Sequence, residues 1–327
     1  MKTKTNHVIV YLIFITFLVS NIYATPPLKF KDKKFKIMQF TDLHYTNTEK
    51  YKSMNDSTIF LMKTLIEEER PDLVILTGDI VVSEPSTEAW KKVVQPMSDL
   101  HVPFAVTFGN HDNETKYSTH EILKNLMKNP FNVTTNEGKS LSGSGNCSLV
   151  IKSSDNEKDC WILYLFDSHA YSGIEQVKGY DWIKNDQIQW YRNRSDSLKE
   201  NNGTLLPALA FFHIPLPEFE YVRKQEKTLG NHSEMVHSPS LNSGLFASFI
   251  EKNDVKGIFV GHDHNNDFVG QLYGIMLGYG RKTGYVPAHQ EILERGGRVI
   301  ELFEDSPRFN TYIRTLSGKF FELSSYY

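Results

Sequence analysis

Residues 35–44, FKIMQF followed by TDLH, set the pattern for the rest of the sequence. The first six residues form an apolar run with the length and composition of a buried strand. The run stops at Thr41, and Asp42 and His44 follow at once. In an extended backbone these two side chains point the same way, so a carboxylate and an imidazole can coordinate one cation. An Asp-x-His pair alone is weak evidence for a metal site.

Short apolar runs that end in polar residues recur along the chain, at 73–76, 104–108, 161–166, 208–212 and 257–260. Helical spacing predicts a helix over 57–69, capped by Ser57, and further helices over 87–94 and 186–199. Strands are predicted at 270–277, 298–302 and 309–316. This alternation favours an α/β sandwich, formed by one domain over 25–327 because no linker divides it.

Metal-type ligands follow five of these strands, as Asp42 and His44, Asp79, Asn110, His213, and His262 with His264. Each has an ordinary explanation when taken singly: Asp79 and Asn110 suit turns, and His213 suits a hydrogen-bonded position in the core. Their co-occurrence at strand ends favours a metal centre. Other histidines lack this context, namely His7, His101, His120, His169, His232, His237 and His289. His169, which follows Phe166, Asp167 and Ser168, comes nearest to it, and we interpret it as structural or as a residue that supports the metal ligands.

Five motifs carry a family resemblance: Asp-Leu-His at 42–44, Gly-Asp at 78–79, Gly-Asn-His-Asp at 109–112, Phe-His-Ile-Pro at 212–215 and Gly-His-Asp-His at 261–264. In this order they resemble the calcineurin-like metallophosphoesterases, and within them the smaller purple-acid-phosphatase-like enzymes. The resemblance extends from about Phe35 to about Leu302. It implies a four-layer α/β/β/α sandwich with two mixed sheets.

The resemblance also implies roles for individual residues. One metal would be held by Asp42, His44, Asp79 and His264, and a second by Asp79, Asn110, His213 and His262, with Asp79 as the bridge. His111 would contact the phosphoryl oxygen or assist the leaving group, beside Asn110 in the substrate site. Asp112 is a candidate for orienting the His111 ring.

One departure concerns the metals. Purple acid phosphatases have Gly-Asp-x-x-Tyr, where the Tyr binds ferric iron, whereas this chain has Val82 at that position. Val82 cannot bind a metal, so a divalent pair of Mn, Zn or Fe(II) is expected as the cofactor. Residues 278–285 resemble the family's Gly-rich loop near the mouth of the site, which makes Tyr279 and Arg281 candidates for substrate contacts. The alternative for this loop is a solvated turn.

The expected activity is hydrolysis of a phosphomonoester by a hydroxide held between the two metals. A phosphodiester is the alternative within the same chemistry. A secreted binding protein with a vestigial metal site is the alternative of another class, although structural metal sites usually have closed thiolate and imidazole shells. An adhesion module would need repeats or many cysteines, and the chain has neither.

Residues 1–24 are predicted to be a signal peptide, because the uncharged apolar run at 7–20 is short for a bilayer span. The alternative is an uncleaved anchor. A secreted or endolysosomal location is expected, and glycosylation sequons occur at Asn55, Asn113, Asn132, Asn146, Asn193, Asn202 and Asn231.

The formal net charge is −3 with no basic tract, so a small phosphorylated substrate is expected rather than nucleic acid or a membrane. The oligomeric state is open.

Cys147 and Cys160 are the only cysteines, and they flank a predicted hairpin. In an oxidising compartment they would pair across it and add about 3 kcal/mol of stability. The alternative is two unpaired thiols.

Overall fold

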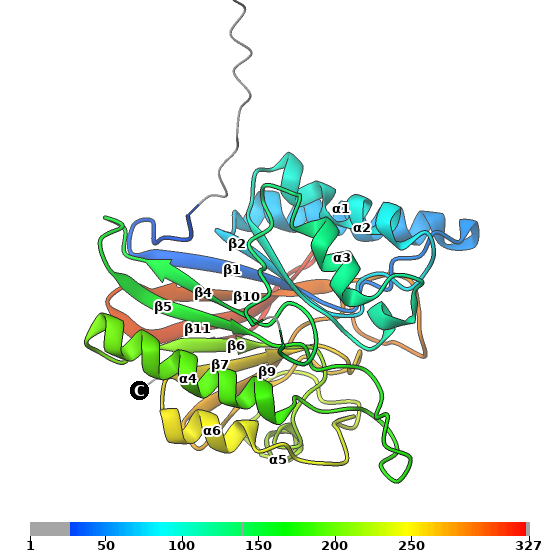
Figure 1. Ribbon diagram of the computed structural model, residues 1–327. Helices are drawn as coiled ribbons and strands as arrows, with labels where there is room; N and C mark the ends of the chain where they lie inside the picture. Colours follow the sequence, from blue (N-terminus) through cyan, green and yellow to red (C-terminus); the bar gives the residue numbers. More distant parts are fainter. Residues whose placement is uncertain (1–26, 139, 325–327) are drawn as a thin grey trace, which may run out of the picture.

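Two mixed sheets lie face to face between two layers of helices in the computed structural model, which describes residues 27–138 and 140–324 (Figure 1). The predicted four-layer α/β/β/α sandwich is therefore confirmed. The proposed signal peptide, residues 1–24, lies outside the described residues. Within the described part of the chain no helix is both long enough and apolar enough to cross a membrane.

The first sheet has the strand order β12-β11-β10-β1-β2-β3. Its strands are β1 (Lys34–Phe40), β2 (Leu73–Thr77), β3 (Phe104–Thr107), β10 (Gly296–Phe303), β11 (Ser306–Thr315) and β12 (Gly318–Ser324). β1, β2 and β3 are parallel, and the other pairings are antiparallel.

The second sheet has the order β4-β5-β6-β7-β9-β8. Its strands are β4 (Cys147–Lys152), β5 (Asp159–Leu165), β6 (Ala208–Phe211), β7 (Val255–Val260), β8 (Val269–Leu272) and β9 (Ile275–Tyr279). β5, β6, β7 and β9 are parallel, whereas β4 and β8 pair antiparallel at the two edges.

Helices cover the outer face of each sheet. The first sheet carries α1 (Lys52–Glu69), α2 (Ser86–Asp99) and α3 (Thr119–Leu126), and the second carries α4 (Asn185–Asn202), α5 (Phe219–Arg223) and α6 (Leu245–Lys252). Two 3-10 helices, η1 (Glu49–Tyr51) and η2 (His111–Glu114), complete the described helices. α3 begins with a capping box, in which Ser118 Oγ accepts from the Glu121 amide at 3.3 Å and Glu121 Oε2 accepts from the Ser118 amide at 2.9 Å.

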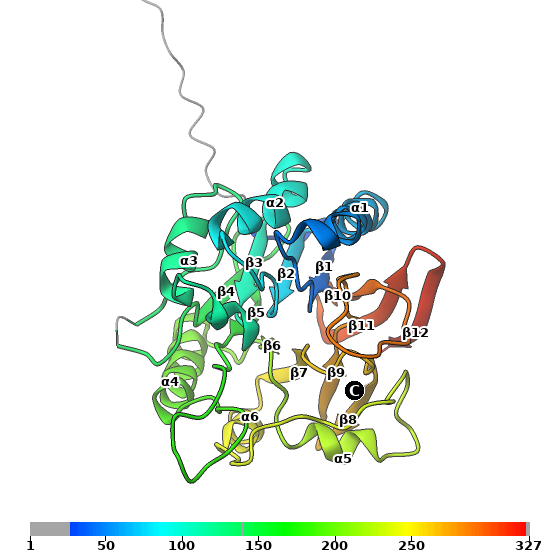
Figure 2. The same cartoon turned by 90° about the vertical axis from the view of Figure 1, so that its right-hand side faces the viewer.

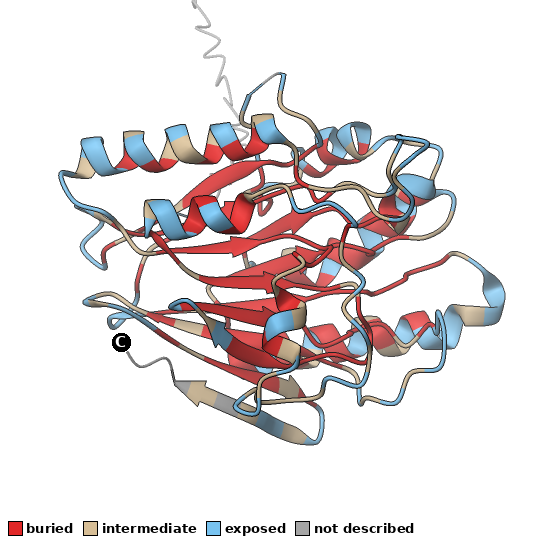
Figure 3. Cartoon of the chain, turned by 90° about the horizontal axis from the view of Figure 1, so that it is seen from below, coloured by how far each residue is buried: buried red, intermediate tan, exposed pale blue. Residues whose placement is uncertain are grey.

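Three apolar clusters fill the spaces between the four layers, one under each helical layer and one between the sheets. The middle cluster joins Ile37 and Ile75 of the first sheet to Leu163 and Phe211 of the second. Both faces of the central strands are therefore buried, as Figure 3 shows in red. This double burial is why their sequences are continuous apolar runs without alternation.

The parallel strands of both sheets end at the same edge of the molecule, the edge viewed in Figure 2. In α/β proteins the loops at the carboxyl ends of parallel strands are where ligands bind. The fold thus brings the ends of β1, β2, β3, β6 and β7 together.

Two predicted elements differ from the structure. α1 begins at Lys52, so Ser57 is inside the helix, where its hydroxyl donates to the Ser53 carbonyl at 2.9 Å and caps nothing. The predicted strand 270–277 is a hairpin of β8 and β9, because Tyr273 and Gly274 both adopt positive φ, as a tight two-residue turn requires.

The predicted disulfide is wrong. The hairpin forms, but its register pairs Cys147 with Leu165 and places Trp161 opposite Ile151, so Cys160 lies at the turn end and Cys147 at the far end. Four residues of strand separate the two positions by about 13 Å, whereas a disulfide needs Cα atoms within about 7 Å. Both side chains are buried free thiols, and burial raises the pKa of Cys147 to about 12.

Reducing agent should therefore leave stability unchanged. We expect the thermal unfolding midpoint to agree within about 1 °C with and without dithiothreitol, whereas loss of a bridge worth about 3 kcal/mol would lower it by roughly 5 °C or more. Differential scanning calorimetry measures this directly. A large drop on reduction would contradict the strand register.

Three of the seven predicted glycosylation sites are inaccessible. Asn55, Asn132 and Asn146 are buried, and their amide nitrogens donate to the carbonyls of Thr46 (2.5 Å), Thr134 (2.9 Å) and Ser142 (2.9 Å). A glycan on such a nitrogen has no route to solvent, so these three predictions are wrong. Asn113 and Asn193 are exposed, Asn202 and Asn231 are half-buried, and these four remain predictions.

Candidate dinuclear metal centre

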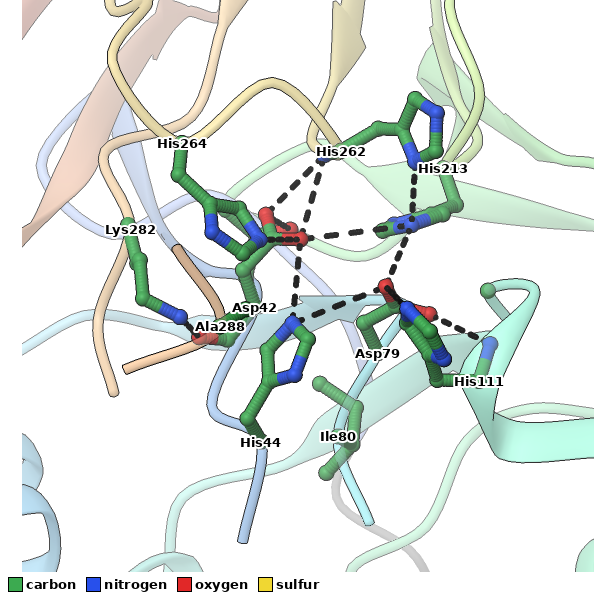
Figure 4. A network of polar contacts seen from close by, with 12 residues as sticks. Asp42, His44, Asp79, Ile80, His111, His213, His262, His264, Lys282 and Ala288 are labelled. Atoms are coloured by element: carbon green, nitrogen blue, oxygen red, sulfur yellow. Dashed lines mark hydrogen bonds and ion pairs between the residues drawn. The ribbon is translucent and has the colours of Figure 1, made fainter. Parts of the chain in front are cut away.

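The seven predicted ligands converge at the carboxyl edge of the two sheets. Asp42 and His44 follow β1, Asp79 follows β2, Asn110 follows β3, His213 follows β6, and His262 and His264 follow β7. Figure 4 shows six of these side chains pointing toward one another. Asn110 adjoins His111, whose backbone N–H donates to Asp79 Oδ1 at 2.9 Å.

The converging side chains form two groups, each with ligand atoms within 4.8 Å of one another. In the first group, Asp42 Oδ1 lies 3.3 Å from His264 Nε2 and 4.0 Å from His44 Nε2. The second group comprises Asp79, His213 and His262. Asp79 Oδ2 lies 3.2 Å from His213 Nε2 and 3.7 Å from His44 Nε2, so this carboxylate faces both groups.

Two of the predicted ligand atoms are buried without a hydrogen-bond partner among the described residues: His44 Nε2 and Asn110 Oδ1. His262 faces the second group with its other ring nitrogen, Nδ1, which lies 3.3 Å from His213 Nε2 (Figure 4). Buried polar atoms are usually paired, and each unpaired one costs about 1–3 kcal/mol. The unpaired nitrogen of His44 and the unpaired oxygen of Asn110 both carry lone pairs suited to a cation. The residues therefore fit a metal centre on the evidence of the side chains alone.

The backbone is strained at the same positions. Asp42, His44, Asp79 and His262 have φ angles of 53°, 49°, 52° and 84°, in the left-handed region that non-glycine residues rarely adopt. Such conformations cost about 1–3 kcal/mol each and cluster at functional sites. The backbone at Asp42 and His44 is therefore not extended, and these two side chains meet from left-handed positions.

Two glycines make the close packing possible. A Cβ at Gly78 would lie 2.5 Å from the His213 ring, and one at Gly109 would lie 2.3 Å from Asp79 Oδ1. Gly78 also has φ of 84°. The glycines that precede Asp79 and Asn110 in the sequence motifs are thus required by sterics.

The electrostatic environment holds most of these groups in metal-binding form. Burial would raise the pKa of Asp42, but a hydrogen bond from His264 and the charge of His213 hold it well below its usual value. Burial lowers the pKa of His44 well below the usual range and that of His262 to about 4. Ionised carboxylates and neutral imidazoles are the states that bind cations.

His213 behaves differently. Burial lowers the pKa of His213, but the negative charge of Asp79 outweighs burial and raises the pKa to about 10. A cation between Asp79 and His213 would satisfy both groups in place of this proton. The His213 ring is fixed by Nδ1, which donates to the Thr77 carbonyl at 2.8 Å and leaves Nε2 facing Asp79.

A second layer of polar residues, missed by the sequence analysis, supports the first group. Glu291 Oε1 lies 2.7 Å from His264 Nδ1, which directs His264 Nε2 toward Asp42. Lys282 is buried, donates to the Asp42 carbonyl at 3.0 Å and lies 3.5 Å from Glu291. Glu291 is 27 residues from His264 in an irregular loop, and no sequence signal marks it.

The predicted substrate contacts of Tyr279 and Arg281 are wrong. Tyr279 is fully buried and its hydroxyl donates to Asp263 Oδ2 at 2.6 Å. Arg281 is buried in an ion pair with Asp267 and donates to the Glu294 carbonyl at 2.7 Å. Because both side chains are buried, the alternative of a solvated turn is also wrong at these two positions.

His111 lies at the rim of the site, with its side chain 34% exposed and Nε2 3.9 Å from Asp79 Oδ2. Its Nδ1 lies 2.9 Å from Glu114 Oε2, so Glu114 orients the ring. The prediction that Asp112 does so is wrong. Asp112 is fully buried and accepts from the backbone amides of Gly109, Ile80 and Val81 at 2.9–3.0 Å.

Asp112 therefore ties the end of β3 to the segment after β2, and so sets the spacing of Asn110 and Asp79. Burial and the charge of Asp79 raise the pKa of Asp112 to about 7, against the hydrogen bonds from the Val81 and Gly109 amides, which favour the carboxylate. The structural role expected for His169 agrees with its contact to Gln187 Oε1 at 2.8 Å.

Two histidines that the sequence analysis set aside lie beside the site. The His289 ring stacks on His264 with centroids 4.7 Å apart, and the His237 ring lies 6.5 Å from that of His262. His237 Nδ1 also lies 2.6 Å from Asp263. Both come from loops that do not follow an apolar run, which is why strand-end context did not identify them.

Comparisons with known proteins agree with this geometry. The family model described as Calcineurin-like phosphoesterase matches residues 35–266. The chain is 33% identical over 297 residues to "Probable inactive purple acid phosphatase 29" of Arabidopsis thaliana, covering 82% of this chain and 76% of that protein. It is 32% identical over 265 residues to "Phosphatase DCR2" of Saccharomyces cerevisiae, covering 72% of this chain and 45% of that protein.

Among solved structures, a dimetal phosphatase from Danio rerio has a similar fold, with a TM-score of 0.61 and 15% identity. The match covers 89% of this chain and 98% of that chain. At this identity the likeness concerns the fold alone.

Proposed function

Because this chain belongs to the calcineurin-like phosphoesterase family, we propose that it hydrolyses phosphomonoesters with two divalent metal ions held by the seven converging side chains. The observation that carries the proposal is the position of Asp79, whose Oδ2 faces His44 in one ligand group and His213 in the other. One carboxylate between two clusters is what a bridged metal pair requires.

The assignment of ligands follows the two groups. Asp42, His44, Asp79 and His264 would hold the first cation, and Asp79, Asn110, His213 and His262 the second. Of the two unpaired candidate atoms, His44 Nε2 belongs to the first set and Asn110 Oδ1 to the second. Mn, Zn or Fe(II) suits these oxygen and imidazole donors.

A bound divalent pair supplies Lewis-acid charge and makes a water molecule acidic enough to attack phosphorus at neutral pH. The chain's own residues do the rest. Asp42 and Asp79 give the centre fewer negative charges than two divalent cations carry, so it attracts a phosphate group. His111 lies at the rim with Nδ1 held by Glu114, and can hold a proton at Nε2 for the leaving oxygen.

The name of one relative includes the word inactive. In this chain, however, all seven expected ligands are present and converge. Val82 occupies the position of the Tyr that binds ferric iron in purple acid phosphatases. The absence of that Tyr favours divalent over ferric ions, and the other seven ligands are unaffected. This supports an active enzyme over the alternative of a binding protein with a vestigial site.

A direct test is hydrolysis of a chromogenic phosphomonoester and the matching diester by purified protein, with Mn, Zn or Fe(II) added after chelator treatment. We expect metal-dependent turnover with a preference for the monoester. Faster turnover of the diester would reassign the substrate class. Absence of turnover with every metal, in folded protein, would favour the vestigial site.

Glu291 offers a separate prediction about metal affinity. Glu291→Gln should weaken binding of Mn²⁺ or Zn²⁺ by about 10- to 100-fold, because groups that orient a ligating histidine have effects of that size. Isothermal titration calorimetry on chelator-treated protein measures this. Glu294→Gln, an exposed change in the same loop, is the matched control. Equal affinities in the two variants would show that Glu291 does not position His264.

We also propose a secreted or endolysosomal location. The apolar run at 7–20 and the exposed sequons at Asn113 and Asn193 support it.

A further inference from the structure

Two tyrosines from the segment between β5 and α4 lie against the second ligand group. The Tyr180 ring packs nearly perpendicular to the His262 ring with centroids 4.4 Å apart. Tyr171 stacks on Tyr180 at 5.6 Å with an interplanar angle of 23°. The rings thus form a continuous row from a proposed metal ligand to the surface.

The segment that carries these tyrosines is held in place by its own contacts. Tyr171 pairs with Tyr180 in an isolated antiparallel bridge, and Ser172 N donates to the Gly179 carbonyl at 3.0 Å. Asp181 N donates to the Ala170 carbonyl at 3.0 Å. A ring presented by such a paired segment loses little conformational freedom when a ligand binds.

The Tyr171 hydroxyl reaches the proposed catalytic groups. Asn110 Nδ2 donates to it at 3.2 Å, and Glu114 Oε1 lies 3.4 Å away. The other oxygen of Glu114 contacts His111 Nδ1 at 2.9 Å. The hydroxyl accepts from Asn110 and donates to Glu114 Oε1, but the bond to Glu114 is longer than an ordinary O–H···O bond, so a ligand oxygen at the rim can replace Glu114 as the acceptor.

Tyr171 remains 51% exposed despite these contacts, and it lines a cavity of about 230 Å³ whose lining includes Gly109, the residue before Asn110. A cavity of about 150 Å³ is large enough for benzene, so one aromatic ring fits here. Asn113, Thr119 and Asp181 line the same cavity and suit a ring that bears a polar substituent.

We propose that Tyr171 and this cavity bind the aromatic leaving group of an aryl phosphate, with the Tyr171 ring stacked on the substrate ring and its hydroxyl bonded to the phosphate. The proposal rests on the phosphoesterase function argued above. It makes Tyr171 a specificity-determining residue for substrates such as phosphotyrosine side chains, and gives no advantage to alkyl phosphates.

The test compares binding of phenylphosphonate and methylphosphonate, which are not hydrolysed, to metal-loaded protein produced without glycosylation. Isothermal titration calorimetry should show that wild type favours the phenyl compound, and that Tyr171→Leu reduces this preference about five- to tenfold, the size of an aromatic pair contribution. Tyr171→Phe should keep the preference and weaken both ligands about equally, because only the hydroxyl is lost.

Tyr273→Leu is the matched control, since Tyr273 is 81% exposed in the β8–β9 turn at the opposite edge of the sheet. An unchanged phenyl preference in Tyr171→Leu would overturn the proposal even if the enzyme hydrolyses phosphomonoesters. If the protein showed no turnover but Tyr171→Leu lost the preference for phenylphosphonate, the aromatic subsite would be supported. The proposed hydrolysis would then be contradicted. The aromatic subsite and the proposed hydrolysis can therefore be contradicted independently of each other.

Discussion

Asp79→Asn should lower kcat/KM for a phosphomonoester by at least about a thousandfold, because the charge stabilisation supplied by a metal pair amounts to several kcal/mol. Asp79 Oδ2 lies 3.2 Å from His213 Nε2 and 3.7 Å from His44 Nε2, so one amide replaces the carboxylate whose single oxygen lies within 3.7 Å of a ligand in each group. The amide has no negative charge and only one oxygen, and cannot bridge two cations.

The variant is assessed by phosphate release and by metal content per chain, with circular dichroism to confirm folding. Asp99→Asn, an exposed change at the end of α2, is the matched control and should behave like wild type. If Asp79→Asn bound two metals and kept more than a tenth of the activity, the bridging role would be wrong.

His111→Ala should keep both metals and lose about a hundredfold or more in kcat, the range expected for a positioned proton donor. The side chain is 34% exposed at the rim, and its Nε2 lies 3.9 Å from Asp79 Oδ2. It belongs to neither group of close ligand atoms. The loss should therefore appear in the rate and not in metal affinity.

His120→Ala provides the control for this prediction, because His120 is exposed on α3 and lies in the same part of the chain. Glu114→Gln should cause a smaller loss than His111→Ala, since Glu114 acts only through the orientation of the ring. Loss of bound metal in His111→Ala would show that His111 is a metal ligand. Full activity in this variant would show that His111 does not donate the proton to the leaving oxygen.

The sequence alone predicted the position of the centre because the parallel strands are continuous apolar runs and their ends are abrupt. Ile37 to Phe40 and Gly257 to Val260 are buried on both faces, so the first polar residue after each marks the sheet edge. Five such edges meet in the fold, and the ligands on them meet as a consequence.

Residues that reach the site from positions other than the strand ends could not be predicted in this way. Glu114, Lys282 and Glu291 owe their positions to tertiary contacts, with no periodicity in the sequence around them. The segment 278–285 illustrates what the sequence does not predict. Lys282 contacts Asp42, whereas its neighbour Arg281 points elsewhere and contacts Asp267. A resemblance locates such a loop but not the direction of each side chain.

The two other failures have similar causes. The cysteine spacing predicted a hairpin correctly, but the distance between the thiols depends on strand register, which composition does not fix. Sequons such as that at Asn146 have no local burial signal, since this Asn is fully covered by distant segments, with its side-chain oxygen accepting from the Asp167 amide at 3.0 Å.

The most direct measurement is a titration of Mn²⁺ or Zn²⁺ into chelator-treated protein, with bound metal per chain and phosphomonoester turnover recorded at each step. Two ions should bind per chain, and turnover should rise as the second site fills. Folded protein that binds no metal, or binds two ions without any turnover, would contradict the assignment of this centre as a dinuclear phosphoesterase site.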